Sequence, residues 1–280
     1  MTRSIVLLGG PDSGKTNYIV PLWCALDSKL GALHAVEQPD DLNFIFEIGE
    51  HIFAGGFAPR TEHSEARRDF EVLVAAEKDG PSARIIVPDI SGELWRDAVE
   101  NNEIDSEWMK ELETSSGALL FIRVGSDQDI RPLDWVTSRR LLEVLGEEDG
   151  PGLPTQVMIC ELIRFLETTL TSREDGKAPR LSIVVSAWDL VDDEVFGGGP
   201  LAYLEREYPL VAGRLSDVEQ LDVQIFGLSS LGGDLKDDHE FRQSFLEAGS
   251  EGLGWVSVNG SDGWIKNPDL TLPIAWAVGL

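Results

Sequence analysis

A short glycine-rich stretch near the amino terminus constrains the fold of this chain more than any other feature. It runs from Gly9 to Thr16 with the sequence GGPDSGKT, follows the apolar run 5–8 and precedes a helix-like segment. Glycines adopt backbone angles that are closed to larger residues, and a strand followed by a glycine turn and a helix points the helix dipole at an anion. The stretch therefore predicts a phosphate-binding loop, the alternative being a glycine-rich turn that binds nothing.

Each residue type in this loop suits the binding of a nucleotide. Backbone N–H groups would surround the phosphates, Lys15 would reach the β and γ oxygens, and the hydroxyl of Thr16 would bind Mg²⁺. The loop residues expected to bind the nucleotide are Gly9, Pro11, Asp12, Ser13, Gly14, Lys15 and Thr16.

Composition limits the other classes of function. With 280 residues, 42% of them hydrophobic, the chain is long enough to form one large domain, and we expect a single domain over 1–280. Its formal net charge of −27 argues against nucleic acid and anionic membranes as partners. No apolar run approaches the roughly 20 residues that span a bilayer, so we expect no membrane span.

The two cysteines indicate the cellular compartment in which the protein works. Cys24 and Cys160 lie in apolar, helix-like segments without a Cys-x-x-Cys pattern. Buried free thiols in this setting favour a reducing, cytoplasmic location.

Apolar strand patterns alternate with helical patterns along the chain. We expect strands at 5–8, 70–74, 84–87, 117–124, 181–186 and 223–228, the second and third forming a hairpin. We expect helices at 15–26, 42–53, 133–145 and 155–170, and a core helix within 270–280. This alternation predicts an α/β P-loop NTPase fold, a doubly wound and mostly parallel sheet flanked by helices, with insertions at about 127–180 and 232–267.

Four short motifs each follow an expected strand. They are Gly9 to Thr16, Asp89 to Gly92, Ser186 to Asp189, and Ser229-Ser230. Ligands of doubly wound sheets bind outside the carboxyl ends of the strands, so these motifs should converge on one edge of the sheet.

In this order the motifs resemble those of P-loop GTPases of the TRAFAC class, which includes Ras-like, Arf-like and Era-like proteins. The resemblance implies that Asp89 holds Mg²⁺ through water and that the N–H of Gly92 meets the γ-phosphate. It also implies that Asp189 accepts the guanine N1 and N2 hydrogens. The backbone of Ser229-Ser230 would contact the guanine O6.

Some positions depart from the family pattern. Ala187 stands where the family has a lysine that covers the base and braces the P-loop. Trp188 either offers an aromatic surface to the base or is a core tryptophan. In Era-like and tRNA-modification GTPases an asparagine at the place of Asp12 helps to hold a monovalent cation. Asp12 therefore either binds K⁺ or bonds its own backbone.

The same resemblance points to residues for hydrolysis. Thr61, the only threonine between Thr16 and Asp89, is expected to bind Mg²⁺ in the triphosphate state. Arg60 is either an arginine finger in cis or a solvated loop charge. Glu93 stands where Ras-like proteins orient the attacking water with a glutamine; it either accepts a proton from that water or is an acid at a helix N-terminus. Slow intrinsic hydrolysis is expected.

A narrower resemblance is to bacterial TRAFAC-clade GTPases encoded with partner proteins in conflict or defence systems. It rests on the Pro-x-Thr loop at 59–61, the long piece before the base-reading strand and the terminal segment 272–276.

Together these observations predict a GTP-binding molecular switch that hydrolyses GTP to GDP and phosphate with Mg²⁺ and acts with a protein effector or a GTPase-activating partner. One alternative, motivated by Ala187 and Glu93, is a nucleotide-binding regulatory module without useful hydrolysis. Another is a P-loop ATPase or kinase, for which Asp189 would be a chance match.

Overall fold

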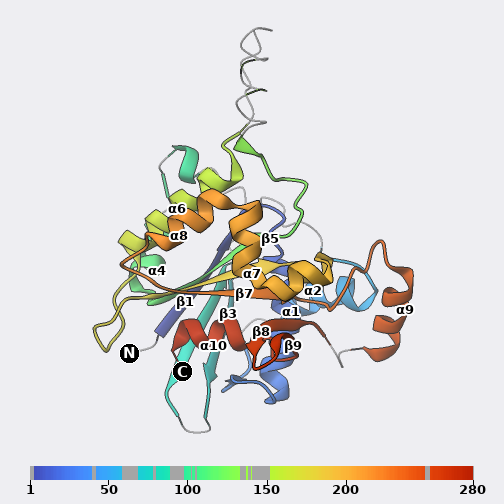
Figure 1. Cartoon of the computed structure of the whole chain (residues 1–280). Helices are drawn as coiled ribbons and strands as arrows, with labels where there is room; N and C mark the ends of the chain where they lie inside the picture. The colour runs from blue at the N-terminus through green and yellow to red at the C-terminus, as the bar shows by residue number, and fades with distance from the viewer. Residues whose placement is uncertain are drawn as a thin grey trace.

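A nine-stranded sheet runs through the centre of the molecule, with helices on both faces (Figure 1). The computed structural model describes residues 3–39, 42–58, 69–77, 80–88, 98–101, 103–104, 106–132, 137, 140, 152–249 and 253–279. The helices are α1 (Lys15–Ser28), α2 (Asn43–Phe53), α4 (Ser106–Thr114), α6 (Thr155–Thr169), α7 (Asp193–Glu207), α8 (Pro209–Ser216), α9 (His239–Ala248) and α10 (Leu272–Val278), with a 3₁₀ turn η1 (Trp188–Leu190).

The strand order is β2-β3-β4-β1-β5-β6-β7-β8-β9. Strands β4, β1, β5, β6 and β7 are parallel, and antiparallel pairs extend the sheet at both ends. The strands are β1 (Arg3–Gly9), β2 (His34–Ala35), β3 (Asp69–Ala75), β4 (Ser82–Pro88), β5 (Gly117–Arg123), β6 (Arg180–Ser186), β7 (Asp222–Ser229), β8 (Trp255–Gly260) and β9 (Gly263–Asn267).

Alternation along β1 explains why both faces are covered. Ile5 and Leu7 belong to one core with α1, α2 and α10, whereas Val6 and Leu8 belong to the core on the other face with α4, α6 and α8. Figure 1 shows α6, α7 and α8 on one side of the sheet and α10 on the other. A continuous apolar run in a central strand therefore produces a sheet buried on both sides.

The predicted fold class is confirmed. The hairpin predicted between 70 and 87 is β3–β4, and the helix predicted at 155–170 is α6, the crossover between β5 and β6. The terminal core helix is α10, whose Ile274, Ala277 and Val278 are buried. The helix predicted at 133–145 lies outside the described residues except at 137 and 140.

The segment 232–267 contains regular structure that was not predicted from the sequence. It holds α9 and the β8–β9 hairpin. Strand β8 pairs with β7, so β7, the final strand expected from the sequence, is not the last strand of the sheet. Trp255 and Val256 are buried there, but β9 is largely exposed. Because this hairpin lies at the sheet edge and has little apolar alternation, its pairing partner decides its structure.

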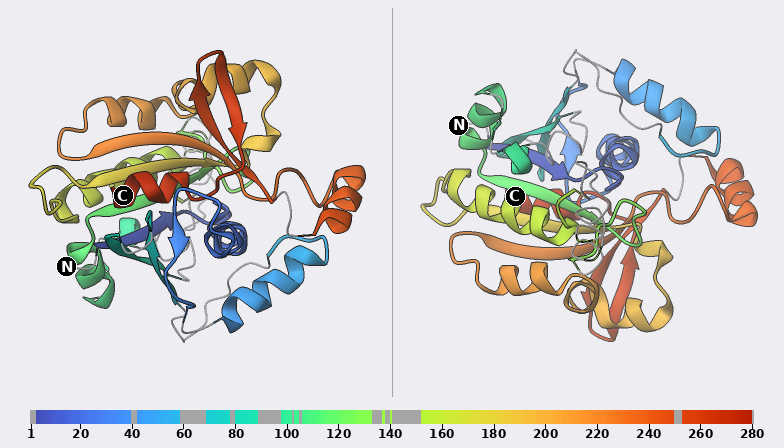
Figure 2. Two further views of the ribbon diagram at one scale, coloured as in Figure 1. Left: turned by 90° about the horizontal axis from the view of Figure 1, so that it is seen from below. Right: turned by 90° about the horizontal axis from the view of Figure 1, so that it is seen from above.

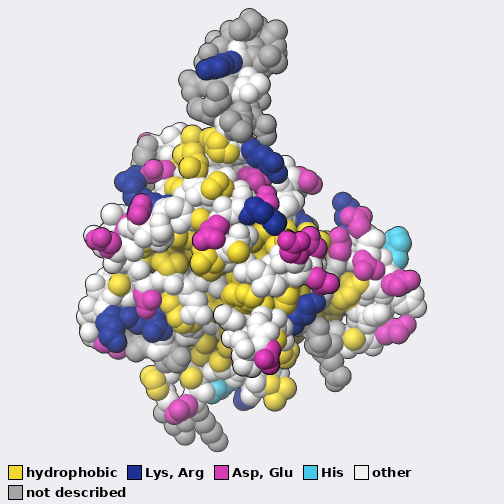
Figure 3. Space-filling model, in the orientation of Figure 1, with side chains coloured by type: hydrophobic (Ala, Val, Ile, Leu, Met, Phe, Trp, Pro, Cys, Tyr) yellow, Lys and Arg dark blue, Asp and Glu magenta, His cyan; other side chains and the backbone are white. Residues whose placement is uncertain are grey.

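Two segments distant in sequence lie beside each other at one side of the molecule. Figure 2 shows α2 next to α9 in both views, and Arg242 of α9 donates a hydrogen bond of 3.5 Å to the carbonyl oxygen of Ala54. In Figure 3 acidic side chains surround α9. The helix and the loop before it carry Asp234, Asp237, Asp238, Glu240 and Glu247.

The two cysteines were expected to be buried free thiols. Cys24 and Cys160 are free thiols, but they are half-buried; this partial burial raises the pKa of each.

Among the helices of the described ranges, none combines the length and the apolar character needed to cross a membrane.

Candidate nucleotide site

The glycine-rich stretch forms the turn between β1 and α1. Gly9 has φ +153°, and a Cβ there would lie 2.6 Å from Ser13 Oγ and 2.9 Å from the carbonyl oxygen of Phe121. Gly14, which caps the N-terminus of α1, has φ +88°. Only glycine fits both positions without strain, as the sequence analysis expected of a phosphate-binding loop.

Lys15 folds back over this loop. Its ammonium donates to the carbonyl oxygens of Gly9 at 2.7 Å and Gly10 at 3.2 Å, and to Ser13 Oγ at 3.1 Å. These contacts hold a positive charge inside the turn of the chain. An anion that approaches the N-terminus of α1 would meet this charge together with the helix dipole.

Asp12 makes an ion pair that the sequence analysis did not foresee. Its carboxylate pairs with the guanidinium of Arg123, the last residue of β5, and it accepts a longer hydrogen bond of 3.4 Å from Ser126 Oγ. Asp12 has φ +59°, the left-handed region that Asp tolerates better than most residues. A pocket of about 40 Å³ adjoins the loop, with Pro11 and Arg123 in its lining.

The motif from Ser186 to Asp189, which we expect to contact the base, begins at the last residue of β6 and touches the loop. The hydroxyl of Ser186 donates a hydrogen bond of 2.6 Å to the backbone carbonyl oxygen of Ser13. A Cβ on Gly14 would lie 3.3 Å from this same hydroxyl. The carboxyl ends of β1 and β6 therefore meet, as expected, although β5 lies between the two strands.

Trp188 lies in the core rather than at the surface. Its ring is fully buried and packs edge-on against Tyr203, with centroids 5.5 Å apart. Gly227 lies so close that a Cβ there would be 2.6 Å from the indole. Of the two alternatives for Trp188, the structure therefore supports the core tryptophan, and the prediction that it binds the nucleotide is wrong.

Asp189, the residue expected to contact guanine, lies just beyond the end of β6. It is half-buried in η1, and its carboxylate makes no hydrogen bond or ion pair with any residue in the described ranges. Ala187, two positions before Asp189, has φ +53°, and this angle turns the chain sharply after β6.

Ser229 is the last residue of β7, the neighbour of β6, and Ser230 follows it directly. Ser229 is buried, and its Oγ accepts a hydrogen bond of 3.0 Å from the N–H of Gly232. Gly254, just before β8, has φ +55° and passes so close that a Cβ there would be 2.3 Å from the carbonyl oxygen of Ser230. Gly254 and Trp255 thus lie directly beside this motif.

Five predicted site residues lie outside the described residues. They are Arg60, Thr61, Asp89, Gly92 and Glu93. The chain on either side of them is placed. Strand β4 ends at Pro88 beside β1, and Asn17 Oδ1 accepts a hydrogen bond of 2.8 Å from the N–H of Ala58.

Two residues of this site, Asn17 and Arg123, were not predicted from the sequence. Asn17 follows the motif threonine directly, and Arg123 is the only cation in the apolar run of β5. Ser186 was predicted as part of a strand-end motif, but its contact with the loop was not.

Other features of the surface have less bearing on phosphate binding. A pocket of about 120 Å³ lies between 98–104 and α6, lined mainly by apolar residues such as Ile104 and Phe165. None of the residues that line it belongs to the loop or to the strand-end motifs. Within the described ranges, no group of three or more His, Cys, Asp or Glu side chains is arranged to hold a metal ion.

Comparison with known proteins identifies the family of this chain. No curated protein matches the chain. Among solved structures, a chain of the signal recognition particle receptor SRb-GTP/SRX complex from Chaetomium thermophilum is similar at 13% identity and a TM-score of 0.38, covering 87% of this chain and 97% of that one. The model of the Double-GTPase 1 family matches residues 6–277. The chain therefore belongs to the Double-GTPase 1 family and is a GTP-binding P-loop GTPase.

Proposed function

We propose that this GTPase is a molecular switch that binds GTP across the P-loop and the end of β6 and hydrolyses it slowly with Mg²⁺ to regulate a partner protein. The hydrogen bond from Ser186 to the carbonyl oxygen of Ser13 is the observation that carries the proposal. It fixes the phosphate-binding loop to the segment that presents Asp189.

The phosphates would lie over the turn 9–16. Its backbone N–H groups and the ammonium of Lys15 bind them, and the N-terminus of α1 adds its dipole. The hydroxyl of Thr16, in the first turn of α1, fits a metal that takes one or two protein oxygens together with phosphate oxygens. We assign Thr16, Thr61 and Asp89 to Mg²⁺, which when bound neutralises charge on the phosphates.

The base would lie at Asp189. A carboxylate accepts two hydrogens from guanine, at N1 and N2, whereas adenine has no hydrogen at N1, so this contact favours GTP over ATP. The methyl group of Ala187 is too short to cover the base as a lysine would. Selectivity then depends on Asp189 and on the backbone of Ser229-Ser230.

Hydrolysis is an in-line displacement at the γ-phosphorus. The oxygen of water forms the new bond, the bond to the β-phosphate oxygen breaks, and GDP and phosphate leave. We assign orientation of the water to Glu93 and contact with the γ-phosphate to the N–H of Gly92. Turnover is slow because a carboxylate at 93 repels the phosphate, and an arginine, either Arg60 or one from a partner, would accelerate it.

The test is GTP binding and turnover by the wild type and by Lys15→Ala, with Lys177→Ala as the control. Both variants remove one lysine, but Lys177 is exposed and pairs with Asp175. We expect Lys15→Ala to weaken GTP binding at least about tenfold and to abolish turnover, and Lys177→Ala to change neither.

Three results would contradict the proposal in different ways. Absence of GTP binding at millimolar nucleotide would exclude the site. GTP retained unhydrolysed for hours, also with candidate partners, would favour the regulatory module. Tighter binding of ATP than of GTP would favour an ATPase or kinase.

A further inference from the structure

Arg123 is a second cation at the phosphate-binding loop, in addition to Lys15. It is the last residue of β5, two positions beyond Phe121, which is opposite Gly9 of β1, and it is itself opposite Ser186 of β6. Its guanidinium pairs with the carboxylate of Asp12, and the two side chains are 30% and 29% exposed. The pair is thus partly shielded from water. A charge interaction is stronger in such a place than at a fully exposed surface.

A carboxylate within a phosphate-binding loop is electrostatically unfavourable. Asp12 lies between Pro11 and Ser13, at the turn whose N–H groups would bind the phosphates, and the chain as a whole carries a net charge of −27. An ionised Asp12 without a partner would repel the γ- and β-phosphates. The guanidinium of Arg123 cancels this charge.

The pair also fixes the shape of the loop. Asp12 has φ +59°, and successive backbone N–H groups converge into an anion-binding nest only when such angles are held. Arg123 is itself anchored, because its backbone pairs with Ser186 in the sheet register and its carbonyl oxygen accepts a hydrogen bond of 3.3 Å from the hydroxyl of Tyr208. The loop is therefore held at Asp12 by Arg123 and at Ser13 by Ser186.

We propose that Arg123 is a positioning residue for GTP binding, which neutralises Asp12 and holds it in the left-handed conformation that directs the loop N–H groups to the phosphates. The proposal rests on the P-loop being the GTP site. In this role Arg123, rather than a K⁺ ion, supplies the positive charge beside Asp12.

The experiment measures the GDP dissociation constant of the full chain by calorimetry for Arg123→Gln, Arg123→Lys, Asp12→Asn and the double variant Asp12→Asn/Arg123→Gln. We expect Arg123→Gln to weaken binding about tenfold, which is about 1.4 kcal/mol. Arg123→Lys should retain most of the affinity. The double variant should recover to within about threefold of wild type, because without the carboxylate there is no charge to neutralise and an asparagine at 12 adopts the left-handed conformation by itself.

The double variant separates this role from a structural one. If Arg123 only supported the fold, removing Asp12 as well would not restore binding, so a double variant as weak as Arg123→Gln overturns the proposal. Wild-type affinity in Arg123→Gln overturns it as well. Arg164→Gln, which breaks the exposed pair with Glu161, is the control and should bind GDP normally.

Two further measurements distinguish a failure of the proposed function from a failure of the role of Arg123. If Lys15→Ala binds GDP as well as the wild type, the P-loop is not the site and the proposed function itself fails. If Lys15→Ala loses binding but Arg123→Gln does not, only the role of Arg123 fails. GTP turnover should be equal in KCl and NaCl, and a stimulation by K⁺ that Asp12→Asn removes would assign the cation role to K⁺ instead.

Discussion

The hydroxyl of Ser186 and the carbonyl oxygen of Ser13 are 2.6 Å apart, which joins two motifs separated by 173 positions in the chain. Ser186 is buried at the end of β6 and Ser13 is buried in the phosphate-binding loop. In the absence of a lysine at position 187, this hydrogen bond joins the loop to the end of β6, where we propose that the base binds.

Replacing Ser186 by alanine should weaken both the fold and nucleotide binding. The loss of one buried hydrogen bond lowers the free energy of unfolding by about 1 kcal/mol. GDP binding should weaken about fivefold because the loop is held less firmly. Denaturant unfolding and calorimetric titration with GDP measure the two effects.

Ser182→Ala is the matched control for this substitution. Ser182 lies on the same strand, is fully buried and donates a hydrogen bond of 2.8 Å to the carbonyl oxygen of Pro273. It should lose similar stability but keep GDP affinity. Equal losses of affinity in the two variants would mean that Ser186 acts only through the fold.

Asp189→Asn should change which base the protein binds. An asparagine cannot accept two hydrogens from guanine, but its amide donates to the oxygen at position 2 of xanthine. We expect GDP affinity to fall at least about tenfold and xanthosine diphosphate affinity to rise. Competition with a fluorescent nucleotide measures both, and Asp193→Asn, an exposed residue in the first turn of α7, should alter neither. Unchanged GDP affinity in Asp189→Asn would remove Asp189 from the site.

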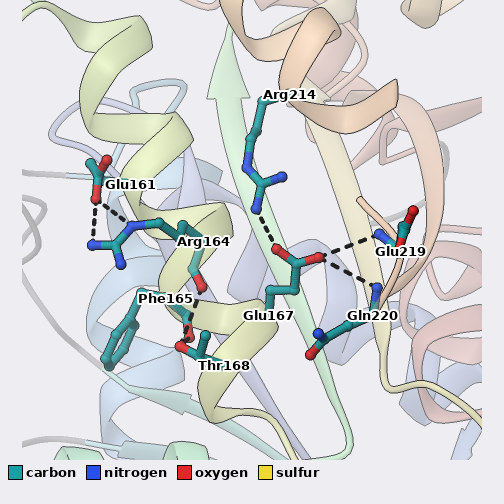
Figure 4. Close-up of polar contacts among 8 residues, drawn as sticks. All are labelled: Glu161, Arg164, Phe165, Glu167, Thr168, Arg214, Glu219 and Gln220. Atoms are coloured by element: carbon teal, nitrogen blue, oxygen red, sulfur yellow. Dashed lines mark hydrogen bonds and ion pairs between the residues drawn. The ribbon is translucent and has the colours of Figure 1, made fainter. Parts of the chain in front are cut away.

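Glu167 of α6 should make stability depend on pH in the acid range. Figure 4 shows its carboxylate held by Arg214 of α8 and by the backbone N–H groups of Glu219 and Gln220. Burial by itself would raise the pKa of Glu167, but the hydrogen bonds from Arg214 and from the backbone outweigh it and lower the pKa. The stabilisation is complete above the unfolded carboxyl value of about 4.3 and is lost as pH falls through the lower folded value.

Glu167→Gln should therefore lower the free energy of unfolding by about 1 kcal/mol at pH 7, and the difference from wild type should shrink toward pH 3. Urea unfolding at a series of pH values measures this. Glu161→Gln, also on α6 and shown in Figure 4, breaks an exposed pair with Arg164 and should have little effect at any pH. A pH-independent difference for Glu167→Gln would argue against the ionised carboxylate as the cause.

Asn17→Ala should loosen the chain that leads to Arg60 and Thr61. The side-chain oxygen of Asn17 is the acceptor for the N–H of Ala58, at 2.8 Å. Without it we expect the amide of Ala58 to exchange with solvent about five times faster, as for the loss of about 1 kcal/mol. Hydrogen exchange read by NMR measures this rate. Ser28→Ala, at the other end of α1, should leave it unchanged, and an unchanged rate in Asn17→Ala would show that Ala58 is held by other contacts.

The sequence by itself determined the parts of this protein that depend on short-range pattern. The spacing from Gly9 to Lys15, the strand before it and the helix after it specify the loop, and the apolar runs specify the parallel strands and the motifs at their ends. These features are local, because backbone angles and the periods of strands and helices are set by neighbouring residues.

Only the tertiary structure decided which side chains meet. Arg123 and Asp12 are 111 positions apart, so neither the period of β5 nor the loop motif indicates that the two pair. The burial of Trp188 and the addition of β8 and β9 to the sheet likewise depend on what packs against them. Strand order and burial bring such groups together, and a polar side chain takes whichever partner the completed sheet places within reach, so these contacts become visible only in the folded chain.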